Sequence, residues 1–128
     1  MTELSLVIIK PDAISRSLVE EIEHRLSLLG LCIIRRRTVI LDMEFVKSLY
    51  RWSVVHHYKE IEEYLCGQPL PVWVVSGDEA VKKCFQLKAD LRKEFAVDRL
   101  HTLIHCPDSQ ADFKRERELL FLESEELL

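Results

Sequence analysis

The pattern of apolar and polar positions along the chain predicts strands and helices in turn. Residues 4–9 form a short, nearly unbroken apolar run, which favours a buried strand because Lys10-Pro11 bounds it. Proline does not readily extend a strand, so a loop is expected next. A helix then follows, with Ser17 as its cap and Gly30 as its stop. Its apolar stripe has spacings of four, four and three residues: Leu18, Ile22, Leu26 and Leu29.

The remaining elements follow from the same kinds of pattern. Short runs rich in β-formers predict strands, and longer amphipathic runs predict helices. Three of these helices are preceded by an aspartate or a serine, which can accept hydrogen bonds from a first helical turn. The strands are expected over residues 31–41, 70–75 and 100–105, and the helices from Asp42 to Trp52, over 57–66, from Asp78 through Phe85, and from Ser109 to about Leu122.

This order of elements, β-α-β-α-α-β-α-β-α, predicts helices layered on a sheet. A split β-α-β pair is the simplest arrangement that fits it. We therefore expect an α/β (α+β) fold, with a ferredoxin-like four-stranded antiparallel sheet covered by helices. The whole chain, residues 1–128, is expected to form a single domain.

Composition and charge restrict the kinds of partner and the cellular location that we expect. The net charge of -4 argues against a nucleic-acid partner, because binding to a phosphate backbone usually needs a basic face. No run of residues approaches the length of a membrane span, and the first residues do not have the pattern of a signal peptide. We expect a cytoplasmic protein with reduced thiols and no metal site, because no zinc-type spacing connects its cysteines: Cys32, Cys66, Cys84 and Cys106.

Two residues at predicted strand ends are candidates for chemistry. Lys10 ends the first strand, so its ammonium is expected at the rim of the sheet, although a lysine can also merely mark the end of a strand. His105 ends the fourth strand, and an imidazole can attack phosphorus and hold the phosphoryl group covalently. It must be neutral and held in one tautomer to do so. The plainer interpretation is a histidine that only packs against the sheet.

Two further residues lie on helices. Glu116 falls on the apolar stripe between Phe113 and Leu120, where a carboxylate is costly unless it is paired. A histidine N–H or an arginine, such as Arg92 or Arg99, would meet that cost. Arg92 itself could bind phosphate oxygens as a fork, or lie in solvent. The run of residues 35–37, all arginine, is expected to divide between the two faces of its strand.

Taken together, these residues resemble the nucleoside diphosphate kinase family over nearly the whole chain. The opening residues 6–13, LVIIKPDA, match the first strand of that family and its KPD signature. Residues 103–109, LIHCPDS, resemble its active-site motif N-x-x-H-G-S-D-S. The ordered set that carries the resemblance most specifically is Lys10, Tyr50, Arg92, His105 and Glu116.

The resemblance implies a mechanism. The imidazole of His105 would take the γ-phosphoryl group from a nucleoside triphosphate such as ATP and give it to a nucleoside diphosphate. Glu116 would orient the imidazole, Lys10 would stabilise negative charge, and Tyr50 would help to place the phosphohistidine. Mg²⁺ would arrive with the nucleotide rather than on protein ligands. A homo-oligomer, a dimer at least, is also implied.

The resemblance further implies a set of nucleotide-binding residues. The base would contact either His57 or Tyr58, because the match to the family has a one-residue gap at this point. Arg92 would contact phosphate, and Thr102 stands where the family has an asparagine. The nucleotide-binding set is Lys10, His57, Arg92, Thr102 and His105.

The chain also departs from the family pattern. Cys106-Pro107 replaces a Gly-Ser pair, the segment between Val81 and Arg92 is shorter, and Phe85 stands near the place of a phosphate-binding arginine. Three interpretations follow. The first is an active, divergent kinase. The second is a kinase-fold protein that binds nucleotide weakly or serves as an interaction module. A ferredoxin-like binding domain with an unrelated role is a third.

Overall fold

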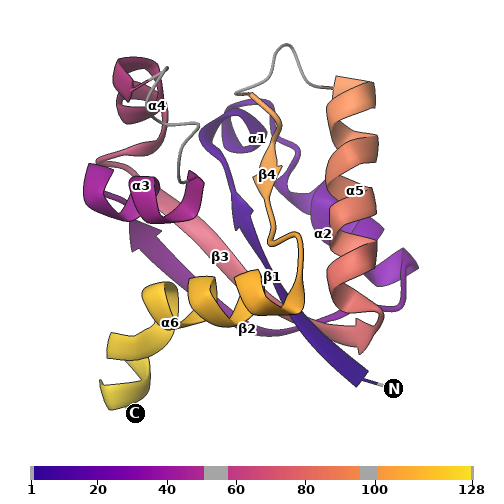
Figure 1. Cartoon of the computed structure of the whole chain (residues 1–128). Coiled ribbons are helices and arrows are strands. Elements are labelled where there is room, and N and C mark those ends of the chain that lie inside the picture. Colours follow the sequence, from indigo (N-terminus) through magenta and orange to yellow (C-terminus); the bar gives the residue numbers. More distant parts are fainter. Residues whose placement is uncertain (1, 51–57, 96–100, 128) are drawn as a thin grey trace.

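The computed structural model describes residues 2–50, 58–95 and 101–127, and the side chains of 2–48, 59–95 and 101–121 within them (Figure 1). The four-stranded sheet has the order β2-β3-β1-β4, and each neighbouring pair is antiparallel, as predicted. The strands are β1 (Thr2–Ile9), β2 (Cys32–Ile40), β3 (Pro69–Asp78) and β4 (Ile104–His105). The helices are α1 (Pro11–Ser15), α2 (Val19–Leu28), α3 (Met43–Tyr50), α4 (Tyr58–Leu65), α5 (Ala80–Phe95) and α6 (Gln110–Leu127).

Helices cover both faces of the sheet, which explains the unbroken apolar run of β1. Successive side chains of a strand point to opposite faces, so a central strand that is covered on both sides needs apolar residues throughout. Val7 and Ile9 pack in a cluster with residues of α2 and α5. Leu6 and Ile8 pack in the other cluster, with residues of α3, α4 and α6. No helix in the described part of the chain is long and apolar enough to cross a membrane.

The three arginines of β2 divide between these faces, as predicted. Arg35 lies over the ring of Phe121, 5.0 Å from its centroid, and Arg37 donates to the carbonyl of Leu120 at 2.6 Å, so both contact α6. Arg36 faces the other side, where its guanidinium lies 2.9 Å from the carboxylate of Glu23 and 5.0 Å from the centroid of the Trp73 ring. The arginine run therefore holds helices to the sheet.

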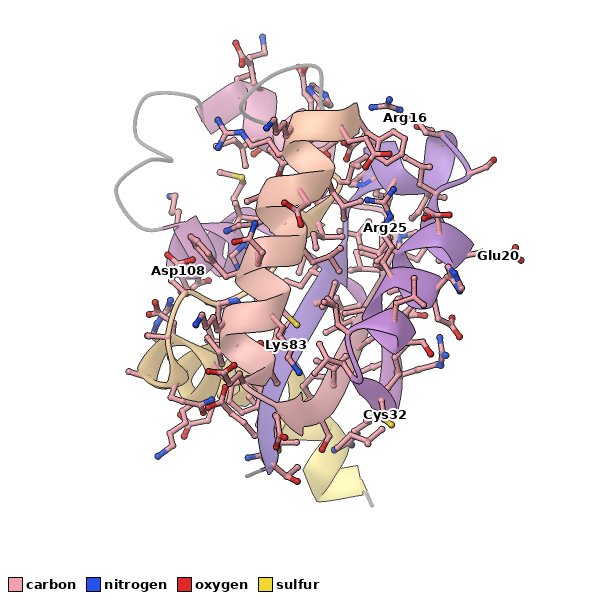
Figure 2. The ribbon with its side chains drawn as sticks, turned by 90° about the vertical axis from the view of Figure 1, so that its right-hand side faces the viewer. Arg16, Glu20, Arg25, Cys32, Lys83 and Asp108 are labelled. Carbon is pink, nitrogen blue, oxygen red and sulfur yellow. The ribbon has the colours of Figure 1, made fainter. Side chains whose placement is uncertain are left out.

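The C-terminal end of α5 is held to α2 by an arginine of α2. Arg25 of α2 donates to Glu94 at 2.8 Å and to Glu21 at 2.7 Å, and its guanidinium lies 5.3 Å from the centroid of the Phe95 ring. Figure 2 shows Arg25 in the space between the two helices, with Arg16 near the same end of α5. These contacts fix the helix that carries Arg92.

The segment after β1 differs from the predicted loop. Pro11 begins the short helix α1, because a missing N–H costs nothing at a first helical position. Ser17 was predicted to cap α2, but it does not cap this helix. It has φ 58°, and the N–H groups of Ser17 and Leu18 donate to the carbonyls of Ile14 and Ala13. This left-handed residue ends α1 instead.

The predicted caps of the later helices have mixed outcomes. Asp42 accepts the N–H of Phe45 at 2.8 Å, and Ser109 accepts the N–H of Asp112 at 3.1 Å, so both caps are confirmed. Asp78 is the last residue of β3 and not a cap. The N–H of Val81, in the first turn of α5, donates instead to Oε1 of Glu3 at 2.9 Å. A carboxylate from β1 thus closes the start of α5.

Several element lengths also differ from prediction, and β1 and β3 are longer than expected. The stretch after Phe85 is regular, because α5 continues to Phe95 with Leu87 and Leu91 buried at helical spacing. Strand β4 has only two residues, and α6 continues past Leu122 to Leu127. The predicted ends at Trp52 and His57 lie outside the described residues.

The Glu3 cap gives a test of the fold. Glu3→Ala is expected to lower the free energy of unfolding by about 1 kcal/mol, because an N–H in the first turn of α5 loses its acceptor. Urea denaturation measures the change, and Glu118→Ala, which alters an exposed residue of α6, is the matched control. Equal stabilities of the two variants would contradict the capping role.

Candidate active site

The edge of the sheet beside β4 brings the two predicted strand-end residues together. His105 pairs with Ile8 across the antiparallel ladder, and Ile104 pairs with Ile9. Lys10 follows Ile9 in extended conformation, with φ -81° and ψ 160°, so it shares the face of Ile8. Lys10 and His105 therefore face the same side of the sheet at one edge.

His105 contacts the carboxylate that the sequence placed on the apolar stripe of α6. Its Nε2 lies 2.7 Å from Oε1 of Glu116, and the side chains are 12% and 3% exposed. The other oxygen, Oε2, lies 3.7 Å from the guanidinium of Arg115. Of the arginine partners considered from the sequence, Arg92 makes no described ion pair with Glu116, and Arg99 lies outside the described residues. The predicted histidine contact is present.

This contact determines which nitrogen of His105 can act as nucleophile. An ionised carboxylate only accepts hydrogen bonds, so Nε2 carries the proton that lies toward Glu116. The lone pair of a neutral imidazole then belongs to Nδ1. The pairing thus gives the tautomer and the ring orientation that an attack on phosphorus requires.

Lys10 is the buried cation of the site. It is 4% exposed, and its Nζ donates to Oγ1 of Thr102 at 2.9 Å. Burial lowers the pKa of Lys10 to about 8, while the nearby carboxylate of Asp12 raises that pKa and the positive charges of Lys88 and Arg92 lower it further. Thr102, predicted to bind nucleotide, is thus hydrogen-bonded to the lysine.

Two cations of α5, Lys88 and Arg92, act electrostatically on Lys10. Arg92 is exposed, and Lys88 precedes it by four residues, so both occupy one stripe of the helix. Lys88, which sequence reasoning did not single out, lies 3.6 Å from Asp108 and 4.9 Å from the centroid of the Phe85 ring. The i to i+4 spacing from Arg92 is the signal in the sequence that could have indicated Lys88.

The cysteine that follows His105 does not compete with it. Cys106 is buried, and its thiol donates to the carbonyl of Cys84 at 3.3 Å, inside the core between the sheet and α5. Burial raises the pKa of the Cys106 thiol, so the thiolate is disfavoured. Among the residues that the structure describes, no group of three or more His, Cys, Asp or Glu side chains is placed to hold a metal ion.

The remaining site candidates are not brought to this edge by described contacts. Tyr50 is the last residue of α3, and Tyr58 is the first residue of α4, but their side chains are not among those described. His57 lies outside the described residues. The predictions for these three residues therefore stay predictions.

Besides Lys88, two residues of the site were not singled out from the sequence. Asp12, within the KPD motif, is 8% exposed and accepts the N–H of Leu103 at 3.0 Å through Oδ2. Tyr64 of α4 donates its hydroxyl to Oδ1 of the same carboxylate. The signal in the sequence for Asp12 was its place in the KPD signature, three residues after the end of the first strand.

Comparison with known proteins agrees with this arrangement. Residues 3–126 match the family model described as nucleoside diphosphate kinase. The nucleoside diphosphate kinase of Metallosphaera sedula is 30% identical over 97% of this chain and 96% of its own length. That of Methanobrevibacter smithii is 31% identical over 98% of this chain and 91% of its own length.

Solved structures show the same fold. The apo nucleoside diphosphate kinase of Encephalitozoon cuniculi has a TM-score of 0.82 and 24% identity, covering 92% of this chain and 88% of its own. That of Aquifex aeolicus has a TM-score of 0.78 and 23% identity, covering 94% and 96%. With its family model, its relatives and its fold in agreement, this chain belongs to the nucleoside diphosphate kinases, a family of phosphotransferases.

Proposed function

We propose that His105 carries the phosphoryl group between nucleotides. In the first half-reaction, Nδ1 attacks the γ-phosphorus of a nucleoside triphosphate, a P–N bond forms, and the bond to the bridging oxygen breaks, so that the diphosphate leaves. In the second, a terminal oxygen of another nucleoside diphosphate attacks, and the P–N bond breaks. The observation that carries this proposal is the 2.7 Å contact between His105 and the buried carboxylate of Glu116.

Glu116 serves this reaction in two ways. Before attack it holds the proton on Nε2, which keeps the lone pair on Nδ1. After attack the ring becomes positively charged, and the carboxylate at 2.7 Å stabilises that charge inside a buried environment. A buried carboxylate acts strongly there because little water screens the pair.

Positive charge near the phosphoryl group comes from both sides of the edge. Phosphoryl transfer depends chiefly on placing positive groups where negative charge accumulates. Lys10 supplies a buried ammonium held by Thr102, and Lys88 and Arg92 add charge from α5. Mg²⁺ would come with the nucleotide, bound mostly by phosphate oxygens and water.

Other parts of the proposal come from the family. Tyr50 would help to place the phosphohistidine, and His57 or Tyr58 would contact the base. Nucleoside di- and triphosphates are the expected substrates, in the cytoplasm, and the chain would act as a homo-oligomer, a dimer at least.

One observation favours a second candidate function. Helix α5 runs without interruption from Ala80 to Phe95, and Phe85, near the place of an expected phosphate-binding arginine, is 46% exposed. Fewer phosphate contacts would weaken nucleotide binding and turnover. The chain would then be a kinase-fold nucleotide-binding or interaction module.

The nucleophile is tested by labelling. With γ-labelled ATP, the protein is expected to gain one acid-labile phosphate, and His105→Ala is expected to abolish the label because the nucleophile is gone. His24→Ala, which changes an exposed histidine of α2, should label normally. Undiminished labelling of His105→Ala would rule out the mechanism. Nucleotide binding without any label on the unmodified protein would support the binding module.

The orienting carboxylate is tested in single-turnover experiments. Glu116→Ala is expected to slow phosphorylation of His105 by about tenfold to a hundredfold, because the imidazole loses its fixed tautomer. Glu118→Ala, an exposed change on the same helix, should leave the rate unchanged. If the two variants react equally fast, the orienting role is wrong.

The buried lysine gives a pH dependence. A lysine supplies positive charge only while protonated, so the Lys10 ammonium is present below about pH 8 and is lost as the pH rises through that value. The ratio kcat/KM, which reports the free enzyme, is therefore expected to fall above about pH 8. In Lys10→Arg the guanidinium stays charged, so this alkaline fall should disappear even if the rate is lower. A fall that is unchanged in that variant would exclude Lys10 as its cause.

A further inference from the structure

Three distant segments of the chain meet at the carboxylate of Asp12. Asp12 lies in α1, its Oδ2 accepts the N–H of Leu103 at 3.0 Å, and its Oδ1 accepts the hydroxyl of Tyr64 from α4. Asp12 is 8% exposed. Figure 1 shows α1 beside the β4 segment at this end of the sheet. A charge buried this deeply requires such partners, and Asp12 has no part in the transfer steps above.

Leu103 has an unfavourable backbone conformation. Its φ is 72°, a left-handed value that residues other than glycine rarely adopt, and its side chain is fully buried. The N–H of Ile104 donates to the carbonyl of Thr102 at 2.8 Å, which closes a tight turn around Leu103. A turn of this kind is rare and strained, and it persists only where its surroundings hold it.

The turn lies between the residue that binds the Lys10 ammonium and the residue that carries the imidazole. Thr102, on one side of the turn, accepts a hydrogen bond from the Lys10 ammonium at 2.9 Å. His105, on the other side, follows Ile104 directly in β4. The carbonyl of Leu103 accepts the N–H of Lys10 at 2.9 Å. The shape of the turn therefore sets where the Thr102 hydroxyl and the imidazole stand relative to each other.

We propose that Asp12 is a positioning residue: it holds the strained turn at Leu103 and thereby aligns the Lys10 ammonium with the His105 imidazole. This role rests on the function proposed above. The carboxylate suits the task because its two oxygens accept from Leu103 and Tyr64 at once. Tyr64 in turn fixes the direction of the carboxylate from α4.

Asp12 also affects the charge of Lys10 directly. The charged and titratable groups that act on this ammonium are Asp12 from α1, Lys88 and Arg92 from α5, and Cys106 after β4. Asp12 is the foremost of those that favour the protonated form, while burial and the two α5 cations oppose it. Removing the charge of Asp12 is therefore expected to lower the pKa of Lys10.

The experiment separates the position of the turn from the charge. Asp12→Ala removes both acceptors. Asp12→Asn can keep its oxygen toward the N–H of Leu103 but loses the charge. Tyr64→Phe removes only the hydroxyl, and Asp90→Asn, at an exposed site of α5, is the matched control. Three readouts are taken on the full chain: hydrogen exchange of the Leu103 amide, the NMR titration of Lys10, and the rate of His105 labelling by ATP.

Each variant has a distinct expected result. In Asp12→Ala the Leu103 amide should exchange about tenfold faster or more, because its acceptor is lost. Its labelling at saturating ATP should slow by about tenfold or more, since misplaced reacting groups lose rate in kcat. In Asp12→Asn exchange should stay close to that of the unmodified protein, while the pKa of Lys10 should fall by about one. Tyr64→Phe should give a smaller increase in exchange than Asp12→Ala.

The outcomes decide between explanations. Unchanged exchange of Leu103 or an unchanged labelling rate in Asp12→Ala would overturn the positioning role. An unchanged pKa of Lys10 in Asp12→Asn would overturn the direct effect of Asp12 on the charge of that lysine. A labelling loss that only follows lowered thermal stability, with both local readouts unchanged, would also overturn the positioning role. If Asp12→Ala does not fold, Asp12→Asn and Tyr64→Phe still give both local readouts. If the unmodified protein is not labelled by ATP, the proposed function fails, while exchange and titration still test Asp12.

Discussion

The candidate active site at the edge of the sheet depends on a carboxylate that is buried beside an imidazole. A buried carboxylate costs free energy unless it accepts hydrogen bonds, and Glu116 meets this requirement through Nε2 of His105 at 2.7 Å. The same contact joins α6 to β4, because the two residues belong to these elements. Losing either partner would leave the other polar group buried without its main interaction. The pairing thus links the packing of α6 to the preparation of the nucleophile.

The cationic part of the site likewise depends on a buried charge and on the groups that stabilise it. Lys10 is buried at the end of β1, where desolvation disfavours its charge, and Thr102 and Asp12 offset part of that cost. The Leu103 turn lies between Thr102 and His105 in the chain, and its N–H is held by the carboxylate of Asp12. Strain in the backbone near a nucleophile is tolerated where neighbouring hydrogen bonds enforce it. The two charged halves of the site are therefore held by one short stretch of chain.

Sequence reasoning succeeded where a residue's surroundings are local or periodic. The nearly unbroken apolar run of β1 indicated a buried strand, and the cores on the two sides of the sheet confirm it. The stripe of Phe113 and Leu120 placed Glu116 on the buried side of α6, and the apolar runs placed Lys10 and His105 at the ends of strands. These features follow from the periods of strands and helices alone.

It failed where a partner lies far away along the chain. Nothing near Val81 shows that its N–H is accepted by Glu3, a residue of another element. The bond between Asp12 and Leu103 spans 91 residues, and the left-handed φ of Leu103 has no signature in its own side chain. Pro11 was taken as a break, although proline also suits the first turn of a helix.

The central claim is that Glu116 directs the phosphoryl group to one nitrogen of His105, and phosphorus NMR tests it most directly. The folded, unmodified protein is incubated with ATP and Mg²⁺, freed of nucleotide, and observed at alkaline pH, where phosphohistidine is stable enough to record. The account predicts one phosphoramidate signal with the shift of Nδ1-phosphohistidine, absent from His105→Ala. A signal from Nε2-phosphohistidine, or from another residue, would contradict it.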